Sequence, residues 1–154
     1  SISVPVMTRA KLEEQRQVSV TLEGLATEMA VPNLTAADAK QLKALDGQMV
    51  AAGKAGDIAT VLARNSDFHM TLYRASRSEL LVDLIQITWL RAGPFLTLVE
   101  GRPEMMKNAK TAHCKLLAAL KSRDPKAALA ENINAAAEQL DAVLGDDGVD
   151  DSGG

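Results

Sequence analysis

Proline and glycine residues at helix-length intervals constrain the fold of this chain more than any other feature of its sequence. They divide it into six segments with apolar residues at helical spacing, and no segment alternates polar and apolar residues over a useful length. Hydrophobic residues make up 47% of the chain but aromatic residues only 3%, so helix formers outnumber the residue types that strands prefer. The sequence therefore predicts an all-α antiparallel bundle.

Local capping signals predict where the first three helices begin. Thr8 is a candidate N-cap for a helix that ends before Pro32, because the residue before a proline is disfavoured in helical dihedrals. Thr35 and Asp38 have the spacing of a capping box for the second helix. Asp57 can accept hydrogen bonds from the first turn of the third.

The later helices are marked by proline. Gly93 and Pro94 predict a kink or break in the fourth helix, with irregular backbone that could face a cavity. Pro103 suits the first turn of a fifth helix, and Asp124 with Pro125 suits the cap and first position of a sixth. The last two helices should form a tight hairpin.

The length of 154 residues fits one domain, which we expect to span residues 9–145. We expect residues 1–8 to be a linker remnant or an extended strap. The acidic, glycine-rich end at 146–154 cannot bury enough apolar area to order itself, and we expect a disordered tail there.

Composition excludes several classes of protein. No apolar run reaches the roughly 18 residues of a membrane span and no leader sequence is visible, so we expect a soluble, cytoplasmic protein without membrane contact. The net charge is −3 and the basic residues are scattered, so this chain should not bind DNA by itself. The single cysteine, Cys114, is expected to be a small buried or half-buried hydrophobe.

Both histidines of the chain fall at positions that can share one site. Asn65 and His69 are four residues apart, on one face of the third helix. His113 lies ten residues before the turn at Arg123, and about as far beyond the turn stands Ala135, so these two positions face each other in an antiparallel hairpin. An ion or polar ligand at the bundle centre could be bound by Asn65, His69 and His113.

Other interpretations of these residues stay open. Each histidine alone is more often a hydrogen-bonded structural residue, and Asp67 is best explained as a solvated surface carboxylate. A helical metallo-hydrolase could use His69 and His113 around a metal-bound water, but no carboxylate base accompanies them, and we predict that the chain is not an enzyme. A dimerisation bundle with no ligand is a further alternative.

Three stretches of the sequence resemble the signature blocks of a known family. They are "RQVSVTLEGLATEMA", "RNSDFHMTLYRASRSELLVDLI" and "AHCKLLAALKSRDPKAALA". They look like the FCD domain, the C-terminal effector-binding domain of the FadR branch of GntR-type transcriptional regulators, over residues 9–144. The resemblance implies a bundle of six to seven helices that forms a homodimer.

The resemblance also implies a central cavity that in many members holds a divalent metal, often zinc. The ligand positions of the family fall on Asn65, His69, His113 and Ala135. Alanine cannot coordinate a metal, so this site has lost a ligand, and stable zinc sites usually have at least three protein ligands. Either a chelating effector helps to hold a metal, or the site is metal-free and its side chains bind the effector directly, which is the favoured interpretation.

A small-molecule effector follows from the same resemblance, with an organic acid as the first expectation. The family's cavity arginine falls on Ser19 here, so Arg16 or Arg91 would have to supply a positive charge, although a surface position is favoured for Arg16. Small side chains at Ser19 and Ala135 would enlarge the cavity. Regulation would belong to a parent protein, since DNA would be bound only through a winged helix-turn-helix domain that these residues do not contain.

Overall fold

The computed structural model describes residues 8–96, 103–128 and 130–132 of the chain, and this part is helical. The elements are α1 (Arg9–Ala30), the short 3₁₀ turn η1 (Val31–Asn33), α2 (Ala36–Lys54), α3 (Ile58–Arg74), α4 (Glu79–Leu96) and α5 (Pro103–Lys121). Residues 125–128 and 130–132 are helical as well. The all-α prediction is confirmed. The expected linker and tail lie outside the described residues, except for Thr8.

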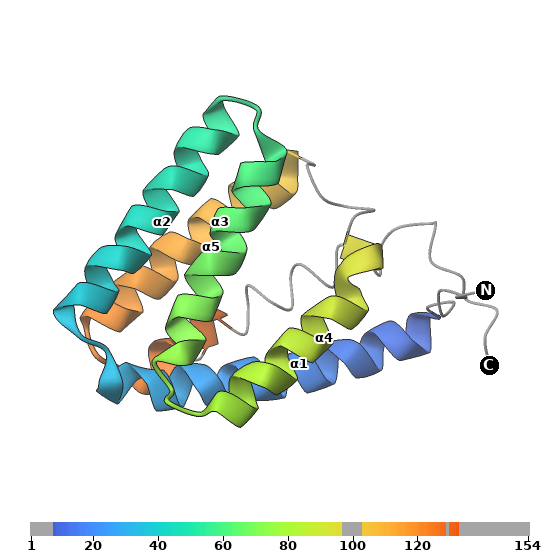
Figure 1. Ribbon diagram of the computed structural model, residues 1–154, viewed down its shortest axis with the longest axis horizontal. Coiled ribbons are helices and arrows are strands. Elements are labelled where there is room, and N and C mark those ends of the chain that lie inside the picture. The colour runs from blue at the N-terminus through green and yellow to red at the C-terminus, as the bar shows by residue number, and fades with distance from the viewer. Residues whose placement is uncertain (1–7, 97–102, 129, 133–154) are drawn as a thin grey trace.

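The helices pack as an antiparallel bundle around α3. α2 runs back along α3 and also contacts α5, whereas α1 packs along α4 and across α3 (Figure 1). The main core is formed by apolar residues of all these helices, among them Ala26, Leu42, Leu72, Ile85 and Leu116. Within the described residues, no helix has the length and apolar character needed to cross a membrane.

The capping signals act as the sequence predicts. The Thr8 hydroxyl accepts from Lys11 N at 3.2 Å, and Thr35 and Asp38 form both hydrogen bonds of the capping box. Asp57 accepts from Thr60 N at 3.1 Å. These side chains satisfy backbone donors that have no partner inside the helix, which fixes where each helix begins.

The structure corrects two predictions. Of the kink or break predicted at Gly93 and Pro94, the break is wrong, because α4 continues to Leu96; proline removes only one backbone hydrogen bond, and the neighbouring turns can hold a helix together. Cys114 is exposed and not buried, because it lies on the outer side of α5 while the adjacent His113 points inward.

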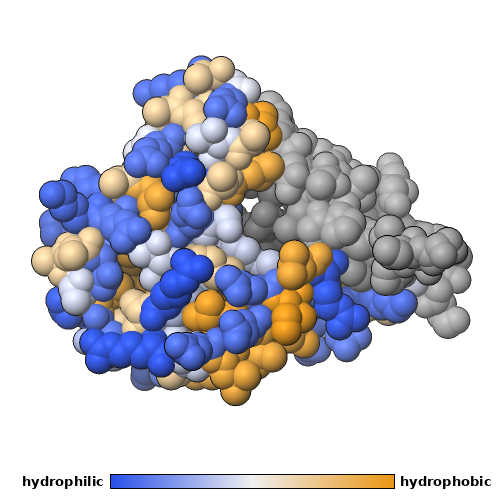
Figure 2. All heavy atoms as spheres, in the orientation of Figure 1, coloured by the Kyte–Doolittle hydropathy of each residue, from blue (hydrophilic) through white to orange (hydrophobic). Residues whose placement is uncertain are grey.

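α1 and α4 together present an apolar surface that the described residues leave uncovered. We call it the α1–α4 face; it consists of Val18, Leu25, Met29, Leu80, Leu84, Ile87 and Leu90. Figure 2 shows hydrophobic residues gathered over α4 and the adjoining part of α1. Leu90 is 78% exposed and Leu80 is 70% exposed, values that are unusual for leucine on two packed helices.

Candidate functional site: a buried cluster of polar side chains

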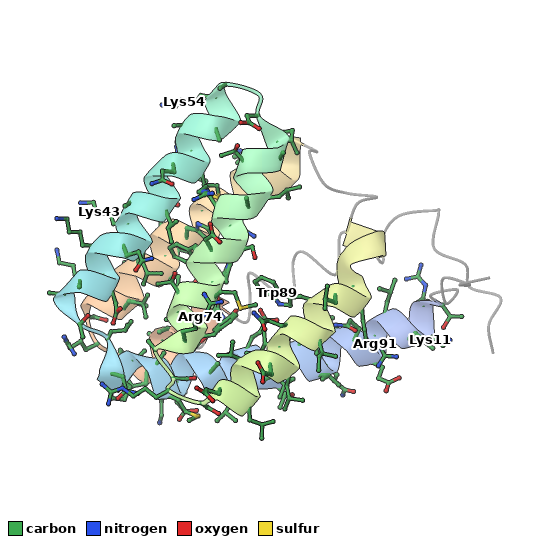
Figure 3. The ribbon with its side chains drawn as sticks, viewed as in Figure 1. Lys11, Lys43, Lys54, Arg74, Trp89 and Arg91 are labelled. Atoms are coloured by element: carbon green, nitrogen blue, oxygen red, sulfur yellow. The ribbon has the colours of Figure 1, made fainter. Side chains whose placement is uncertain are left out.

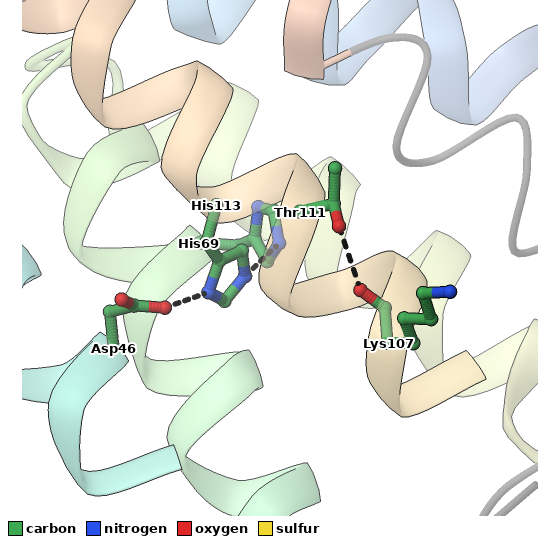
Figure 4. A network of polar contacts seen from close by, with 5 residues as sticks. All are labelled: Asp46, His69, Lys107, Thr111 and His113. Carbon is green, nitrogen blue, oxygen red and sulfur yellow. Dashed lines mark hydrogen bonds and ion pairs between the residues drawn. The ribbon is translucent and has the colours of Figure 1, made fainter. Parts of the chain in front are cut away.

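His69 and His113 meet inside the bundle, as the sequence predicts. α3 and α5 bring their Nε2 atoms to 3.3 Å (Figure 4). On the other side of its ring, His113 Nδ1 lies 3.0 Å from a carboxylate oxygen of Asp46 on α2. His113 is buried and its ring stacks on Phe68, with centroids 4.0 Å apart. Three helices thus form one row of polar groups, Asp46, His113 and His69.

Burial keeps both imidazoles neutral. It lowers the pKa of His69 from 6.5 to about 3, with a smaller effect in the same direction from His113. Burial also lowers the pKa of His113 to about 4. Neutral imidazole has one donor nitrogen and one acceptor nitrogen, so at neutral pH each ring can donate one hydrogen bond and accept one.

A second polar group lies beside the first. The Tyr73 hydroxyl donates to Glu23 Oε1 at 2.7 Å, and Asn132 Nδ2 donates to that hydroxyl at 2.9 Å and to Thr27 Oγ1 at 3.0 Å. Glu23 is only 4% exposed, and Trp89 is a further hydrogen-bond partner of its carboxyl group. Burial raises the pKa of Glu23 to about 7, opposed in part by these two hydrogen bonds.

Aromatic rings connect the two groups. The Trp89 ring stands at 76° to His69 and at 77° to Tyr73, with centroid distances of 6.1 and 6.2 Å. Trp89 and His69 are only partly buried. Figure 3 shows Trp89 between α3 and α4.

The other residues predicted for the site lie in different environments. Asn65 lies one turn from His69 on α3 and is partly buried, without a hydrogen bond to either imidazole. Ser19 is buried and accepts from Gln15 Nε2 at 3.2 Å, so it lies inside the protein and not on its surface. Arg16 is partly buried on α1, and Ala135 lies outside the described residues.

Two charged residues lie at the surface. Arg91 is exposed near the far end of α4, so the structure does not bring it to the cluster (Figure 3). Asp67 is exposed and pairs with Arg64 at 3.3 Å, as expected for a solvated carboxylate.

The sequence interpretation missed most of the cluster. Glu23 belongs to the first of the three family blocks and lies one helical turn after Ser19, the predicted cavity position, and this spacing was a usable signal. Tyr73 lies one turn after His69 on α3, which places it on the same face. Asp46 lies 67 positions before His113 in the chain, and no local sequence pattern indicates a contact between them.

The donors in the described part of the chain do not complete a metal site. Two imidazole Nε2 atoms 3.3 Å apart could bind one ion, but among the described residues no group of three metal-ligating acidic, histidine or cysteine side chains occurs. Asp46 binds the far nitrogen of His113, which orients the ring but leaves the carboxylate outside the position of an ion. Two strong ligands are fewer than a stable zinc site needs.

Comparisons with known proteins agree with this architecture. Residues 14–141 match the FCD domain family. The HTH-type transcriptional regulator McbR of Escherichia coli is 30% identical over 127 residues, covering 80% of this chain and 57% of that protein. The solved structure of E. coli McbR/YncC superposes with a TM-score of 0.80 at 28% identity, over 90% of this chain and 66% of that one. The chain thus spans less than two thirds of either relative.

Proposed function

Because the chain belongs to the FCD domain family, we propose that it is the ligand-sensing and dimerisation domain of a GntR-type transcriptional regulator, in which a small metabolite bound at the buried cluster controls DNA binding. It is a regulatory domain and not an enzyme. DNA contact would belong to a winged helix-turn-helix part of the same regulator, in the cytoplasm.

The proposal rests above all on the buried polar cluster itself. Burying an imidazole or a carboxyl group costs free energy unless each polar atom is paired. Here Asp46, His69, His113, Glu23 and Asn132 converge from separate helices, and His69 Nδ1 and Asn132 Oδ1 are buried without a hydrogen-bond partner. A bundle that served only to dimerise would gain stability from apolar side chains at these positions, so the cluster supports ligand binding.

We expect the ligand to bind without a resident metal. His69 can hydrogen-bond a metabolite directly through Nδ1, and the low pKa values of both histidines keep their rings neutral across the physiological range. Zinc should then be absent from protein purified without chelator or nickel resin. Calorimetric titration of zinc should give no stoichiometric binding, in wild type and His69→Ala alike. Micromolar binding that His69→Ala removes would contradict this and favour a metal held with help from a chelating effector.

The α1–α4 face supports homodimerisation. Its seven apolar residues are exposed on two helices that pack against each other, and exposed apolar surface of this kind on a folded domain marks an interaction site. A two-fold interface pairs a surface with itself, which a face made of two neighbouring helices can do. Since Trp89 and Glu23 lie on these same two helices, a ligand at the cluster could shift the dimer arrangement.

The test is a search for stabilising ligands. Metabolites should be screened by thermal unfolding, with organic acids as the first class because of the family. At least one compound should raise the melting temperature of wild type, since a ligand that binds only the folded state stabilises it. His69→Ala should lose that response, and Asp83→Asn, an exposed change on α4, should keep it. If no class of compound stabilises the protein, the ligand-free dimerisation bundle is the better explanation.

A further inference from the structure

The hydrogen-bond roles in the cluster determine which kind of ligand group it lacks; this inference rests on the proposed function. The carboxylate of Asp46 can only accept, so His113 donates from Nδ1 and its Nε2 has a lone pair. His69 must then donate from Nε2 across the 3.3 Å contact. The remaining nitrogen, His69 Nδ1, is left as a buried acceptor without a partner.

The orientation of Asn132 follows from a similar argument. The Thr27 hydroxyl donates to the backbone oxygen of Glu23 at 2.8 Å, and the Tyr73 hydroxyl donates to the Glu23 carboxyl group. Both hydroxyl protons are therefore used, and only the amide nitrogen of Asn132 can donate to both oxygens. This leaves Asn132 Oδ1, in a side chain that is 1% exposed, as a second unpaired acceptor.

These two acceptors belong to side chains that both lie beside Tyr73: the His69 and Tyr73 ring centroids are 6.1 Å apart, and Asn132 Nδ2 donates to the Tyr73 hydroxyl at 2.9 Å. A proton on His69 Nδ1 would let it donate to Asn132, which is why the Asn132 side chain raises the pKa of His69, but burial keeps the ring neutral. In the tautomer set by Asp46 and His113, neither atom can donate to the other. A ligand group with N–H donors would satisfy both, whereas a carboxylate would bring further acceptors and no donor.

Glu23 supplies a negative charge that a ligand with N–H donors could balance if it is a cation. Two consecutive hydrogen bonds join it to Asn132, through Tyr73. Its partners, Tyr73 and Trp89, are neutral donors, and no ion pair to its carboxylate is present within the described part of the chain. One turn earlier on α1, Ser19 occupies the position from which a longer basic side chain could reach the carboxylate.

We propose that the ligand of this cluster is a small cation bearing an amine or amidine, whose N–H groups pair with His69 Nδ1 and Asn132 Oδ1 and whose charge is balanced by Glu23. The rings of Trp89 and Tyr73 suit the same ligand, because the faces of aromatic rings attract cations. The organic acid expected from the family resemblance fits these groups less well.

The chain has a single tryptophan, Trp89, whose fluorescence therefore reports on this site alone. We would titrate n-butylammonium chloride and sodium butyrate, two probes of equal chain length and opposite charge, with sodium chloride holding the ionic strength constant. Wild type should show a saturable change in emission with n-butylammonium and none with butyrate. Glu23→Gln should lose most of the response. Glu13→Gln, which removes the same charge from an exposed position of α1, should keep it.

The probe pair in wild type decides the question even if Glu23→Gln does not fold, which circular dichroism would reveal. Saturation with butyrate alone, a response to n-butylammonium that survives in folded Glu23→Gln, or no response to either probe would overturn the inference. An organic acid found by the thermal screen would overturn it too, but would leave the proposed function standing.

Discussion

Glu23 differs from the other acidic residues because its carboxyl group is buried, with no cation paired to it among the residues that the structure describes. Its pKa is 4.5 when exposed and about 7 in the folded protein, so the folded state retains a proton that the unfolded state loses between these pH values. The free energy of unfolding therefore decreases as the pH rises through this window. Above it, the buried charge costs up to about 3 kcal/mol, since one pKa unit corresponds to roughly 1.4 kcal/mol.

Glu23→Gln should accordingly stabilise the protein at about pH 8, by up to about 3 kcal/mol, and by much less near about pH 4.5, where the wild-type group is protonated in the folded state and about half protonated in the unfolded state. Urea unfolding at the two pH values measures both differences. Glu13→Gln, exposed on the same helix, provides the comparison. An equal effect of Glu23→Gln at both pH values would contradict an uncompensated buried carboxylate.

The two histidines act in the opposite direction. Their folded-state pKa values, about 3 and about 4, lie below the ordinary 6.5, so the unfolded chain binds protons that the folded chain does not. They therefore lower stability as the pH falls from about 6.5 towards 4. His69→Asn should lose less stability than wild type over this range, as measured by thermal unfolding. Because the chain has only two histidines, His113→Asn added to His69→Asn should reduce the loss further.

Two glycines show how the same residue type has opposite roles in different elements. Gly47 lies inside α2, and a Cβ added there meets nothing within 4 Å. Gly56 lies in the turn between α2 and α3 with φ at 72°, a left-handed conformation in which side chains are strained. Space for a Cβ is available at both positions, so only the backbone conformation makes an alanine substitution favourable at one and unfavourable at the other.

We therefore expect Gly47→Ala to raise the free energy of unfolding by about 0.5–1 kcal/mol, since alanine favours helix over glycine. Gly56→Ala should lower it by about 1 kcal/mol, because a Cβ opposes the left-handed conformation. Urea unfolding of the two variants side by side measures the difference. If Gly56→Ala were as stable as wild type, the turn would have another backbone conformation available.

At the scale of the whole molecule, the α1–α4 face should determine assembly. Ile87 is 52% exposed in this face, and a charge there would be buried at a two-fold interface. Ile87→Glu should convert a dimer to a monomer in sedimentation equilibrium. Gln48→Glu adds the same charge at an exposed position of α2, a helix that packs against α3 and α5, and should leave the dimer intact. A wild type that sediments as a monomer would refute dimerisation through this face.

The sequence by itself determined the helices. Caps such as Thr8, Thr35 and Asp57 act within three residues along the chain, so their effect is readable without knowing the fold. It also determined the pairing of His69 with His113, because spacing along α3 and distance from the turn at Arg123 locate both positions in an antiparallel bundle. The FCD family was readable for the same reason, since its blocks are local patterns.

Only the tertiary structure decided what surrounds the histidines and which apolar residues stay outside. Asp46, Glu23 and Asn132 reach their partners across 50 to 105 positions of the chain, and such contacts depend on how the helices pack. Likewise, Val18, Leu25 and Met29 repeat at the spacing of a core stripe, yet they are exposed. Periodicity shows that residues share one face of a helix, but the packing of neighbouring helices decides whether that face lies in the core or is left for another molecule.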